Sequence, residues 1–504
     1  MPDPMPAQVT RPVPPLGPGA EVVAAELARR FSADGAPWFW WDGGGAAAGE
    51  ERVSILGIAS EVRRAAPGEE HEFLERMRRE SGAVAADEAH GGASGAFPQR
   101  RGFGGGWAIA LAYEFGAALL GIAPDPAPGF APGPVLGVAR DPAPGVAPDP
   151  EPHPGFAPDV ASPVAVALRC EVVVAVDHDA NAVELRGPSR EAIDAWLDRH
   201  GRHLRPVAAE GVAEPESAPA RRHDPGDAPR WRRSDAEYAE AVEQCRAAIR
   251  AGEAYVLCLT DTAEVPGACD PVEIYERLRA AGPPMRGGIL DAGSHALVSA
   301  SPERFLSVRG RRVATHPIKG TRRRGGSGRA DRELAARLAA DPKERAENLM
   351  IVDLMRNDLS RVCEPGSVRV DRFLDVETHP HVLQLVSTVS GALARGAGVW
   401  DAIAAAFPGG SMTGAPKRRA VELLQRIEGG PRGFYSGCFG WIDRGGDAEL
   451  AMTIRTVELH RGDRPVARAA AGGGITIDSV AASEVSEKHV KAAALLEALC
   501  CSAR

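Results

Sequence analysis

The sequence contains few cysteines, and none of them has a spacing that indicates a shared metal site. Eight cysteines occur in 504 residues, no two form a Cys-x-x-Cys pair, and Cys500 and Cys501 are adjacent. This spacing argues against a zinc site built from cysteines and against a framework of disulfide bonds. Free thiols are typical of a reducing compartment, so we expect a cytoplasmic protein.

An excess of positive charge and a long apolar run are also absent. The net charge is −9, which argues against a general nucleic-acid binder. No segment approaches the roughly 18 consecutive apolar residues of a membrane span, and residues 1–21 lack the apolar core of a secretory signal. With 44% hydrophobic and 25% charged residues, the composition is that of a soluble globular protein.

Two segments that are poor in branched apolar residues divide the chain. Residues 123–163 repeat a Pro-Ala-Pro-Gly theme, cannot bury a core, and are expected to form an exposed insertion. Residues 205–230 are polar and are expected to form a linker. We therefore predict an N-terminal supporting domain over residues 1–204, which contains the proline-rich insertion, and a catalytic domain over residues 231–504.

Two predicted helices after the linker each carry a pair of glutamates one turn apart. The segment "DPKERAENLMIVDLMRNDLSRV" contains Glu344 and Glu347, and a helix predicted to begin near Ser483 contains Glu484 and Glu487. Carboxylates on one turn repel each other unless a cation lies between them, and Mg²⁺ prefers oxygen ligands. The pattern predicts either a magnesium site between two helices or two ordinary solvated helix surfaces.

A lysine, Lys319, ends an apolar strand-like stretch in "THPIKGTRRRG", directly before a basic turn. Glu303 follows another strand-like stretch, "ALVSAS", 16 residues earlier in the chain. An amine and a carboxyl group at the ends of neighbouring strands can act as nucleophile and acid. A solvated salt bridge explains the same pair equally well.

Glycine-rich stretches and one strand arginine indicate an anionic ligand. Residues 407–425, "FPGGSMTGAPKRRAVELLQ", form a loop before a predicted helix, where an anion can bind, although a tight turn is an equal alternative. An Ala-Pro pair replaces the Lys-Ser/Thr of a phosphate loop, which argues against a nucleoside triphosphatase. Three glycines at 472–474 lie in a predicted strand and let a ligand approach the backbone. Arg455, in the apolar stretch "AMTIRTVEL", is expected to form a buried ion pair or to bind a carboxylate.

Taken together, these segments resemble the chorismate-utilising enzymes, which include anthranilate synthase component I, aminodeoxychorismate synthase component I, and the isochorismate and salicylate synthases. The resemblance is dense from about residue 233 to residue 500, in "SPERF", "PIKGTRRRG", "AENLMIVDLMRNDL", "SMTGAPK", "AMTIRT" and "GGGITIDSVAASEVSEKHVKA". It implies an α+β fold in which two mostly antiparallel β-sheets pack as a sandwich with flanking helices. The active site is expected in the cleft between the sheets.

The resemblance also implies a role for each candidate residue. Glu347 and Glu487 are expected to bind Mg²⁺ directly. Glu344 and Glu484 are expected to act on the ion through water, and the ion is expected to hold the ring carboxylate of chorismate. Glu303 is expected to be the general acid that protonates the departing C4 hydroxyl group. The residues expected to bind the substrate are Gly320, Thr321, Tyr435, Arg455, Gly472, Gly474 and Lys491.

Lys319 distinguishes two branches of the family that the sequence resembles. Anthranilate synthases normally have alanine at this position, in "PIAGT", and aminodeoxychorismate synthases have lysine, in "PIKGT". The resemblance implies that the lysine attacks C2, so that ammonia adds at C4. We therefore expect an aminodeoxychorismate synthase component I that supplies 4-aminobenzoate for folate or for a secondary metabolite. The alternatives are anthranilate synthase component I and a catalytically weak relative that binds a partner protein.

Ammonia is expected to come from a second protein. No cysteine has the Gly-x-Cys-x-Gly setting of a glutaminase nucleophile, so a separate glutamine amidotransferase subunit is expected, in a heterodimer. Two positions depart from the family pattern. Gln384 replaces a common histidine, and Val256 stands where water-adding members have a base lysine and amine-adding members have glutamine or glutamate. The valine argues against isochorismate or salicylate synthesis.

Overall fold

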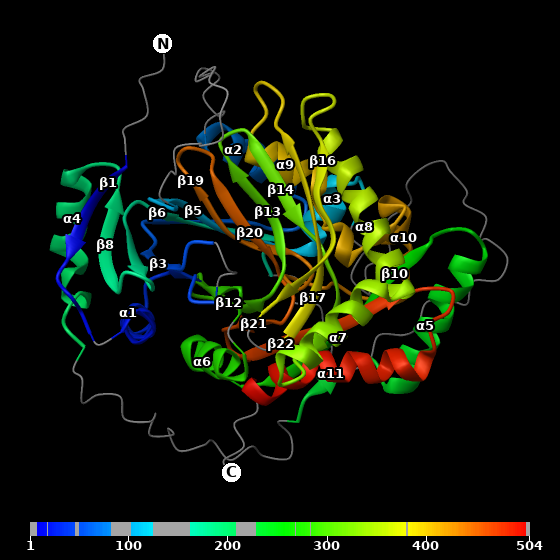
Figure 1. Cartoon of the computed structure of the whole chain (residues 1–504). Coiled ribbons are helices and arrows are strands. Elements are labelled where there is room, and N and C mark those ends of the chain that lie inside the picture. The colour runs from blue at the N-terminus through cyan, green and yellow to red at the C-terminus, as the bar shows by residue number, and fades with distance from the viewer. Residues whose placement is uncertain are drawn as a thin grey trace, which may run out of the picture.

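Two large β-sheets with helices around them make up the protein (Figure 1). The computed structural model describes residues 8–17, 19–45, 50–81, 102–123, 162–207, 228–267, 269–282, 284–379 and 382–499. The proline-rich insertion predicted at 123–163 and the linker predicted at 205–230 lie largely outside the described residues. The arrangement of sheets and helices confirms the predicted α+β fold.

The first sheet contains twelve strands in the described part of the chain, and its neighbouring strands pair antiparallel. In spatial order its strands are β1 (Val9–Val13), β8 (Ala182–Gly187), β7 (Val173–Asp177), β3 (Val53–Ile58), β2 (Trp38–Asp42), β11 (Arg286–Asp291), β12 (His295–Ser301), β21 (Thr456–His460), β22 (Val466–Ile475), β10 (Val256–Pro266) and β18 (Gly414–Ala415). The short strand β9 (Arg230–Trp231) also pairs with β10.

The second sheet contains ten strands among the residues described, again paired antiparallel. Its spatial order is β15 (Ile318–Arg323), β17 (Val382–Ala392), β14 (Arg312–His316), β13 (Arg304–Arg309), β20 (Ala448–Met452), β19 (Cys438–Asp443), β5 (Gly106–Leu111), β6 (Ala165–Cys170) and β4 (Glu61–Ala65), with β16 (Arg369–Thr378) also paired to β17. Both sheets join strands from before and after the predicted linker, through β2 with β11 and β5 with β19. The division into two domains stays a prediction.

Eleven α-helices flank the sheets in the described ranges. They are α1 (Ala20–Ala33), α2 (Glu70–Ser81), α3 (Tyr113–Leu119), α4 (Arg190–His200), α5 (Asp235–Arg250), α6 (Pro271–Ala281), α7 (Gly328–Ala340), α8 (Pro342–Ser360), α9 (Val399–Ala406), α10 (Lys417–Glu428) and α11 (Ala481–Leu499). Helices α6 and α11 run along the lower edge of the view in Figure 1. None of the described helices combines the length and the apolar character that crossing a membrane requires.

The tryptophan-rich strand β2 shows how the core is divided. Side chains along a strand alternate between its two faces. Phe39 and Trp41 therefore join the core between the sheets, where the Trp41 ring lies 5.5 Å from that of Phe439 in β19. Trp38 and Trp40 point the other way and pack with α1 and α6 on the outer face. Because both faces of β2 are covered, its first four residues are all aromatic instead of alternating with polar ones.

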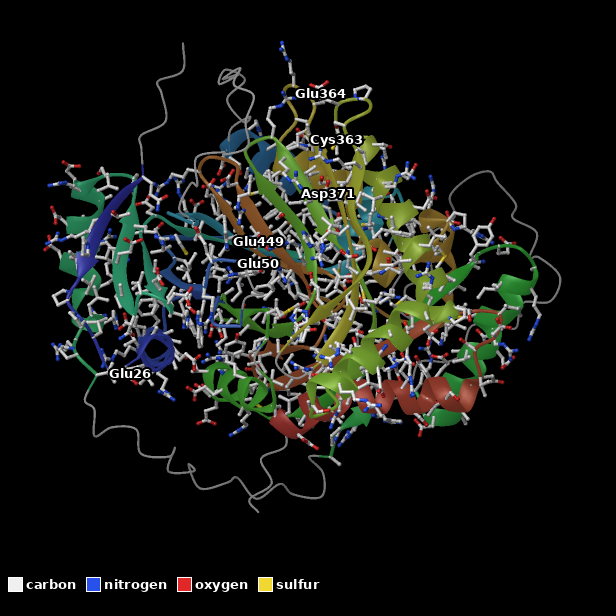
Figure 2. The ribbon with its side chains drawn as sticks, viewed as in Figure 1. Glu26, Glu50, Cys363, Glu364, Asp371 and Glu449 are labelled. Carbon is white, nitrogen blue, oxygen red and sulfur yellow. The ribbon has the colours of Figure 1, made fainter. Side chains whose placement is uncertain are left out.

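A buried ionic cluster links the two sheets. Glu449 in β20 accepts hydrogen bonds from Arg286 of the first sheet, at 3.2 Å, and from Arg304 of the second, at 2.5 Å. Glu50 bonds both arginines at 2.8 Å and lies beside Glu449 in Figure 2. Burial alone raises the pKa of Glu449, but the guanidinium groups of Arg304, Arg286 and Arg309 outweigh burial and lower it to about 2.

We predict that Glu449→Gln lowers the free energy of unfolding by about 3 kcal/mol at pH 7, because it removes the more buried of the two carboxylates that neutralise Arg286 and Arg304. Since the folded pKa of Glu449 is below its ordinary value of 4.5, its stabilising effect is present above pH 4.5 and is lost as the pH falls toward about 2. The difference between wild type and variant in denaturant unfolding should therefore shrink as the pH falls from about 4.5 to about 2.

The matched control is Glu364→Gln. Glu364 pairs with Arg311 on the surface, where the two side chains are 42% and 46% exposed. An exposed pair of this kind contributes less than about 1 kcal/mol. Equal losses of stability in the two variants would show that the buried cluster does not join the sheets.

Candidate active site

Helix α8 is fixed at its start by an aspartate cap. The Asp341 side chain accepts hydrogen bonds from the backbone N–H groups of Lys343, at 3.0 Å, and Glu344, at 3.2 Å, and Pro342 occupies the first turn. The helix then continues through the predicted segment. Glu344 and Glu347 consequently lie one turn apart on neighbouring positions of its surface.

Helix α11 presents the second pair of glutamates to strand β22. It begins at Ala481, two residues before the predicted start at Ser483, and carries Glu484 and Glu487 in its first two turns. A Cβ atom added to Gly473 would lie only 3.1 Å from Glu484 Oε2 and 3.2 Å from Glu487 Oε1. Because Gly473 has no side chain, both carboxylates have space to lie against this strand.

The two glutamate pairs meet around neighbouring glycines. A Cβ atom at Gly474, next to Gly473, would lie 3.9 Å from Glu347 Oε2 on α8. On the other side of α8, a Cβ atom at Gly320 would lie 3.0 Å from the carboxyl carbon of Glu344, and the φ of Gly320 is +77°, a value that favours glycine. Strands β22 and β15 thus approach α8 closely at positions without side chains.

The electrostatics of these carboxylates fit a divalent cation. Burial, and then the neighbouring charge of Glu347, raise the pKa of Glu344, and burial also raises the pKa of Glu484. The Lys491 ammonium lies 2.6 Å from Glu487 Oε1 and lowers the pKa of Glu487 against the effect of burial. No three of the four carboxylates, all of which lie in the described part of the chain, place oxygens within 4.8 Å of one another. This spacing fits a Mg²⁺ ion that some of the carboxylates contact directly and the others contact through water.

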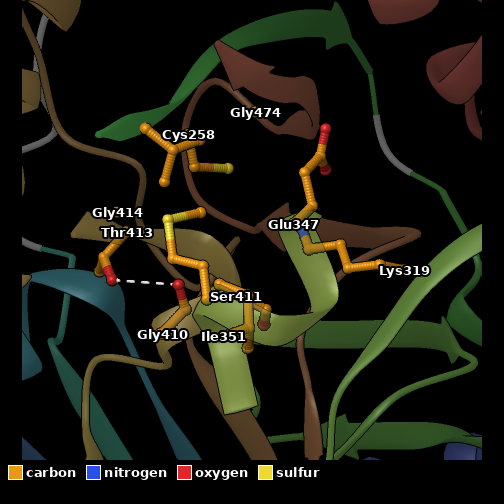
Figure 3. A pocket seen from close by; sticks show the side chains of 11 residues that line it. Cys258, Lys319, Glu347, Ile351, Gly410, Ser411, Thr413, Gly414 and Gly474 are labelled. Atoms are coloured by element: carbon orange, nitrogen blue, oxygen red, sulfur yellow. Dashed lines mark hydrogen bonds between the residues drawn. The ribbon is translucent and has the colours of Figure 1, made fainter. Parts of the chain in front are cut away.

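A small cavity, partly open to solvent, lies beside the glutamates (Figure 3). Three predicted residues line it: Lys319 from β15, Glu347 from α8 and Gly474 from β22. In Figure 3, Lys319 and Glu347 enter from the same side. The other lining residues are Val256, Cys258, Met350, Ile351, Gly410, Ser411, Thr413 and Gly414.

The predicted acid, Glu303, contacts this cavity through Ser411. Glu303 lies between β12 and β13, is 6% exposed, and accepts a hydrogen bond from the Ser411 side chain. Burial raises the pKa of Glu303, and the Ser411 hydrogen bond and the positive charge of Lys319 oppose this effect. Lys319 itself forms no ion pair with any described carboxylate. The arrangement therefore places a half-buried amine near a carboxyl group with a raised pKa.

Three further candidates contact the same region. Lys491 Nζ donates a hydrogen bond of 2.8 Å to the Gly472 carbonyl oxygen, on the strand that approaches the glutamates. Tyr435 is 8% exposed, and burial, with the neighbouring Cys258 thiol, raises its pKa, so that it presents a neutral hydroxyl group. Carbonyl, hydroxyl and ammonium groups of this kind can orient a carboxylated ligand.

Arg455 and Thr321 are placed differently from the other candidates. Arg455 lies between β20 and β21, not within a strand as the sequence predicts, and has a φ of +50°. Its side chain is exposed and forms no hydrogen bond or ion pair with the described residues. Thr321 is exposed on β15, opposite Gln384 of β17. For these two residues a contact with ligand stays a prediction.

The basic turn after Lys319 is partly neutralised by acidic side chains. Arg322 lies 3.4 Å from an Asp341 oxygen and 3.5 Å from a Glu344 oxygen. Arg324 lies 2.7 Å from Asp331 on α7. These arginines therefore attach β15 and the residue that follows it to the two neighbouring helices.

Two residues that line the cavity are not predicted from the sequence. Ser411 lies in the "GGSMTG" loop. The sequence predicts an anion site from the backbone of this loop, but it does not indicate that the Ser411 hydroxyl group contacts Glu303. Cys258 lies in an apolar strand segment, where nothing in the spacing marks it as a lining residue. Both positions become recognisable only when β10 and the loop before β18 are brought together by backbone pairing.

Comparison with known proteins gives one consistent family. Residues 144–497 match the family described as chorismate binding enzyme. The chain is 39% identical over 362 residues to anthranilate synthase component 1 of Mycolicibacterium smegmatis, with 68% of each chain covered. It is 45% identical over 270 residues to aminodeoxychorismate synthase of Streptomyces pristinaespiralis, which covers 53% of this chain and 37% of that protein. The chain thus spans about two thirds of the first relative and well under half of the second.

A solved structure extends the similarity to the fold. Anthranilate synthase component I from Streptococcus pneumoniae TIGR4 superposes with a TM-score of 0.67 and 25% sequence identity, covering 90% of this chain and 93% of that chain. The similarity includes strands on both sides of the predicted linker, in agreement with the shared sheets.

We predict that Gly473→Ala weakens Mg²⁺ binding on the order of tenfold, because the added methyl group displaces the carboxylates of Glu484 and Glu487. Gly474→Ala is the matched control on the same strand, since its Cβ atom would lie 3.5 Å from Val256 and 3.9 Å from Glu347, at ordinary contact distance. Isothermal titration with Mg²⁺, or with Mn²⁺ as its substitute, measures the difference. Identical affinities in the two variants would contradict a cation site against Gly473.

Proposed function

Because the chain belongs to the family of chorismate binding enzymes, we propose that it converts chorismate and ammonia to 4-amino-4-deoxychorismate, as an aminodeoxychorismate synthase component I. The observation that carries this proposal is the amine of Lys319 in a cavity that Glu347 and Gly474 also line. An amine without an ion-paired carboxylate is suited to act as a nucleophile. The product is a precursor of 4-aminobenzoate.

Glu344, Glu347, Glu484 and Glu487 would hold Mg²⁺, which supplies positive charge that binds and orients the ring carboxylate of chorismate. Around it, the side chains of Tyr435 and Lys491 and the backbone of Gly472 and Gly474 would position the substrate. Thr321, Gly320 and Arg455 belong to the same proposed set. The buried position of Tyr435 keeps its hydroxyl group protonated, so that it can donate a hydrogen bond to a carboxylate.

The chemistry of the chain itself then has two steps. In the first, the neutral amine of Lys319 forms a bond to C2, both ring double bonds shift, and the C4–oxygen bond breaks. Glu303, whose raised pKa favours the protonated acid, gives its proton to the departing hydroxyl group, which leaves as water. In the second, ammonia forms a bond to C4, both double bonds shift back, and the C2–nitrogen bond to Lys319 breaks. The proton that the new C4 amine loses restores the acid form of Glu303. The net reaction consumes one chorismate and one ammonia and yields one aminodeoxychorismate and one water.

Anthranilate synthase component I is the second candidate. Coverage favours this candidate. The chain covers 68% of the length of the anthranilate synthase component 1 relative, but 37% of the length of the aminodeoxychorismate synthase relative. In that reaction ammonia itself adds at C2. A catalytically weak relative is a third possibility, based on the departures at Gln384 and Val256. The three candidates differ in the product that the purified chain forms.

We predict that the wild-type chain with chorismate, Mg²⁺ and an ammonium salt forms the C4 amine, and that Lys319→Ala lowers its rate of formation by at least about 100-fold. Residual amination in the variant should shift toward C2, because nothing then occupies that carbon. Lys319→Arg is the matched control, since it keeps the positive charge but not the nucleophile, and should be as inactive as the alanine variant. Chromatography with mass detection resolves the products.

The result also separates the candidates. Anthranilate from the wild-type chain would support the second candidate, and no turnover would support the third. An unchanged rate of C4 amination in Lys319→Ala would show that Lys319 is not the nucleophile, even if chorismate is the substrate.

We also propose that a separate glutamine amidotransferase subunit supplies ammonia to this chain. The proposal is supported by the lack of a cysteine in a Gly-x-Cys-x-Gly setting. We predict that the purified chain uses ammonium salts, with a rate that rises with pH as more free ammonia forms, and that glutamine does not replace them. Glutamine-dependent turnover by the single chain would refute the need for a partner.

A further inference from the structure

Two histidines and an aspartate converge at the end of helix α1, on elements that do not line the cavity. Asp34 is the C-terminal cap of α1, His200 is the last residue of α4, and His203 belongs to the short 3₁₀ helix Gly201–His203. One ligand atom from each side chain lies within 4.8 Å of the other two. His203 Nε2 is 3.2 Å from Asp34 Oδ2.

Aromatic side chains surround the two imidazoles. Phe31 contacts the His203 ring edge-on, with 5.3 Å between ring centroids, and Trp196 lies 5.3 Å from the His200 ring. His203 is 5% exposed. The Nδ1 atom of His200 is buried and has no hydrogen-bond partner among the described residues. A buried polar atom without a partner is costly, and a bound ligand removes that cost.

The three side chains are of the types that bind a transition metal. Two imidazoles and one carboxylate supply nitrogen and oxygen ligand atoms, and these atoms lie close enough together to share one ion.

We propose that Asp34, His200 and His203 form a site for a transition-metal cation of the Zn²⁺ class, with water as the fourth ligand. Zn²⁺ takes nitrogen and carboxylate ligands in a tetrahedral arrangement. Bound there, it would link the end of α1 to the end of α4. The proposal does not depend on the reaction proposed above, because none of its residues lines the cavity.

The guanidinium group of Arg202 already binds the Asp34 carboxylate that the metal ion would use. Arg202 Nη2 donates to both oxygens of Asp34, at 2.6 Å and 2.7 Å. The Arg202 side chain is 54% exposed, so its pair with Asp34 contributes little to stability. A divalent ion held by two imidazoles can therefore displace it, and Arg202→Gln should strengthen Zn²⁺ binding.

The test is a Zn²⁺ titration followed by calorimetry in excess Mg²⁺, repeated in the Glu347→Gln/Glu487→Gln background so that the active-site carboxylates do not contribute. We expect one Zn²⁺ per chain in both backgrounds. His200→Gln and Asp34→Asn should each weaken binding on the order of tenfold or more. His489→Gln is the matched control, because His489 also lies beside an aspartate, 2.7 Å from Asp235, but has no second histidine nearby in the described part of the chain. This variant should bind Zn²⁺ as tightly as the wild type does.

A second readout is local to the site. Ni²⁺ bound beside Trp196 should quench part of the tryptophan fluorescence, and the quenching should be lost in His200→Gln and in Trp196→Phe. Thermal unfolding without metal checks that the variants fold. Zn²⁺ should raise the melting temperature of the wild type and of His489→Gln, but not that of His200→Gln or Asp34→Asn. The proposal would be overturned if the wild type failed to bind Zn²⁺, or if His200→Gln and Asp34→Asn bound it as tightly as the wild type does.

Discussion

Repulsion within two pairs of partly buried carboxylates is the constraint that the centre of this structure has to satisfy. Glu344 and Glu347 come from α8, Glu484 and Glu487 come from α11, and glycines of β22 and β15 lie against them. Partial burial makes the repulsion stronger, since water screens it less. The helices keep their positions because other contacts fix them. In α11, the fully buried Lys488 lies 3.2 Å from Asp261 of β10, the strand that pairs with β22.

This arrangement separates two tasks that share one cavity. The carboxylates and the glycine strand form one side of the site, and relatives with different names share this family. The side chain at position 319 faces the same space from β15 but belongs to neither helix. A substitution at position 319 therefore changes the side chain in this space without changing the four carboxylates. Overall identity to either group of relatives is a poor guide to a difference at this one position.

The sequence was informative where a function depends on local spacing. The cap at Asp341, the turn spacing of Glu344 and Glu347 and the strand glycines at 472–474 are read directly from neighbouring residues, and the resemblance supplied the sandwich fold. Contacts between residues far apart in the chain could not be predicted from the sequence. Asp34 and His203 meet only because the end of α1 lies near the end of α4 in the folded chain. Arg455 was assigned to a strand because apolar residues flank it, whereas the connection between β20 and β21 places it outside.

The pairing of β5 with β19 has a consequence for biosynthesis. Residues 106–111 obtain one of their two strand neighbours only from residues 438–443, more than 300 positions later in the chain. During translation, the N-terminal strands must therefore remain soluble with one backbone edge open until most of the chain has left the ribosome. Pairing between such distant segments slows folding, and an open apolar edge favours aggregation. Recombinant yield should consequently depend on chaperone capacity and growth temperature more than on the stability of the finished protein.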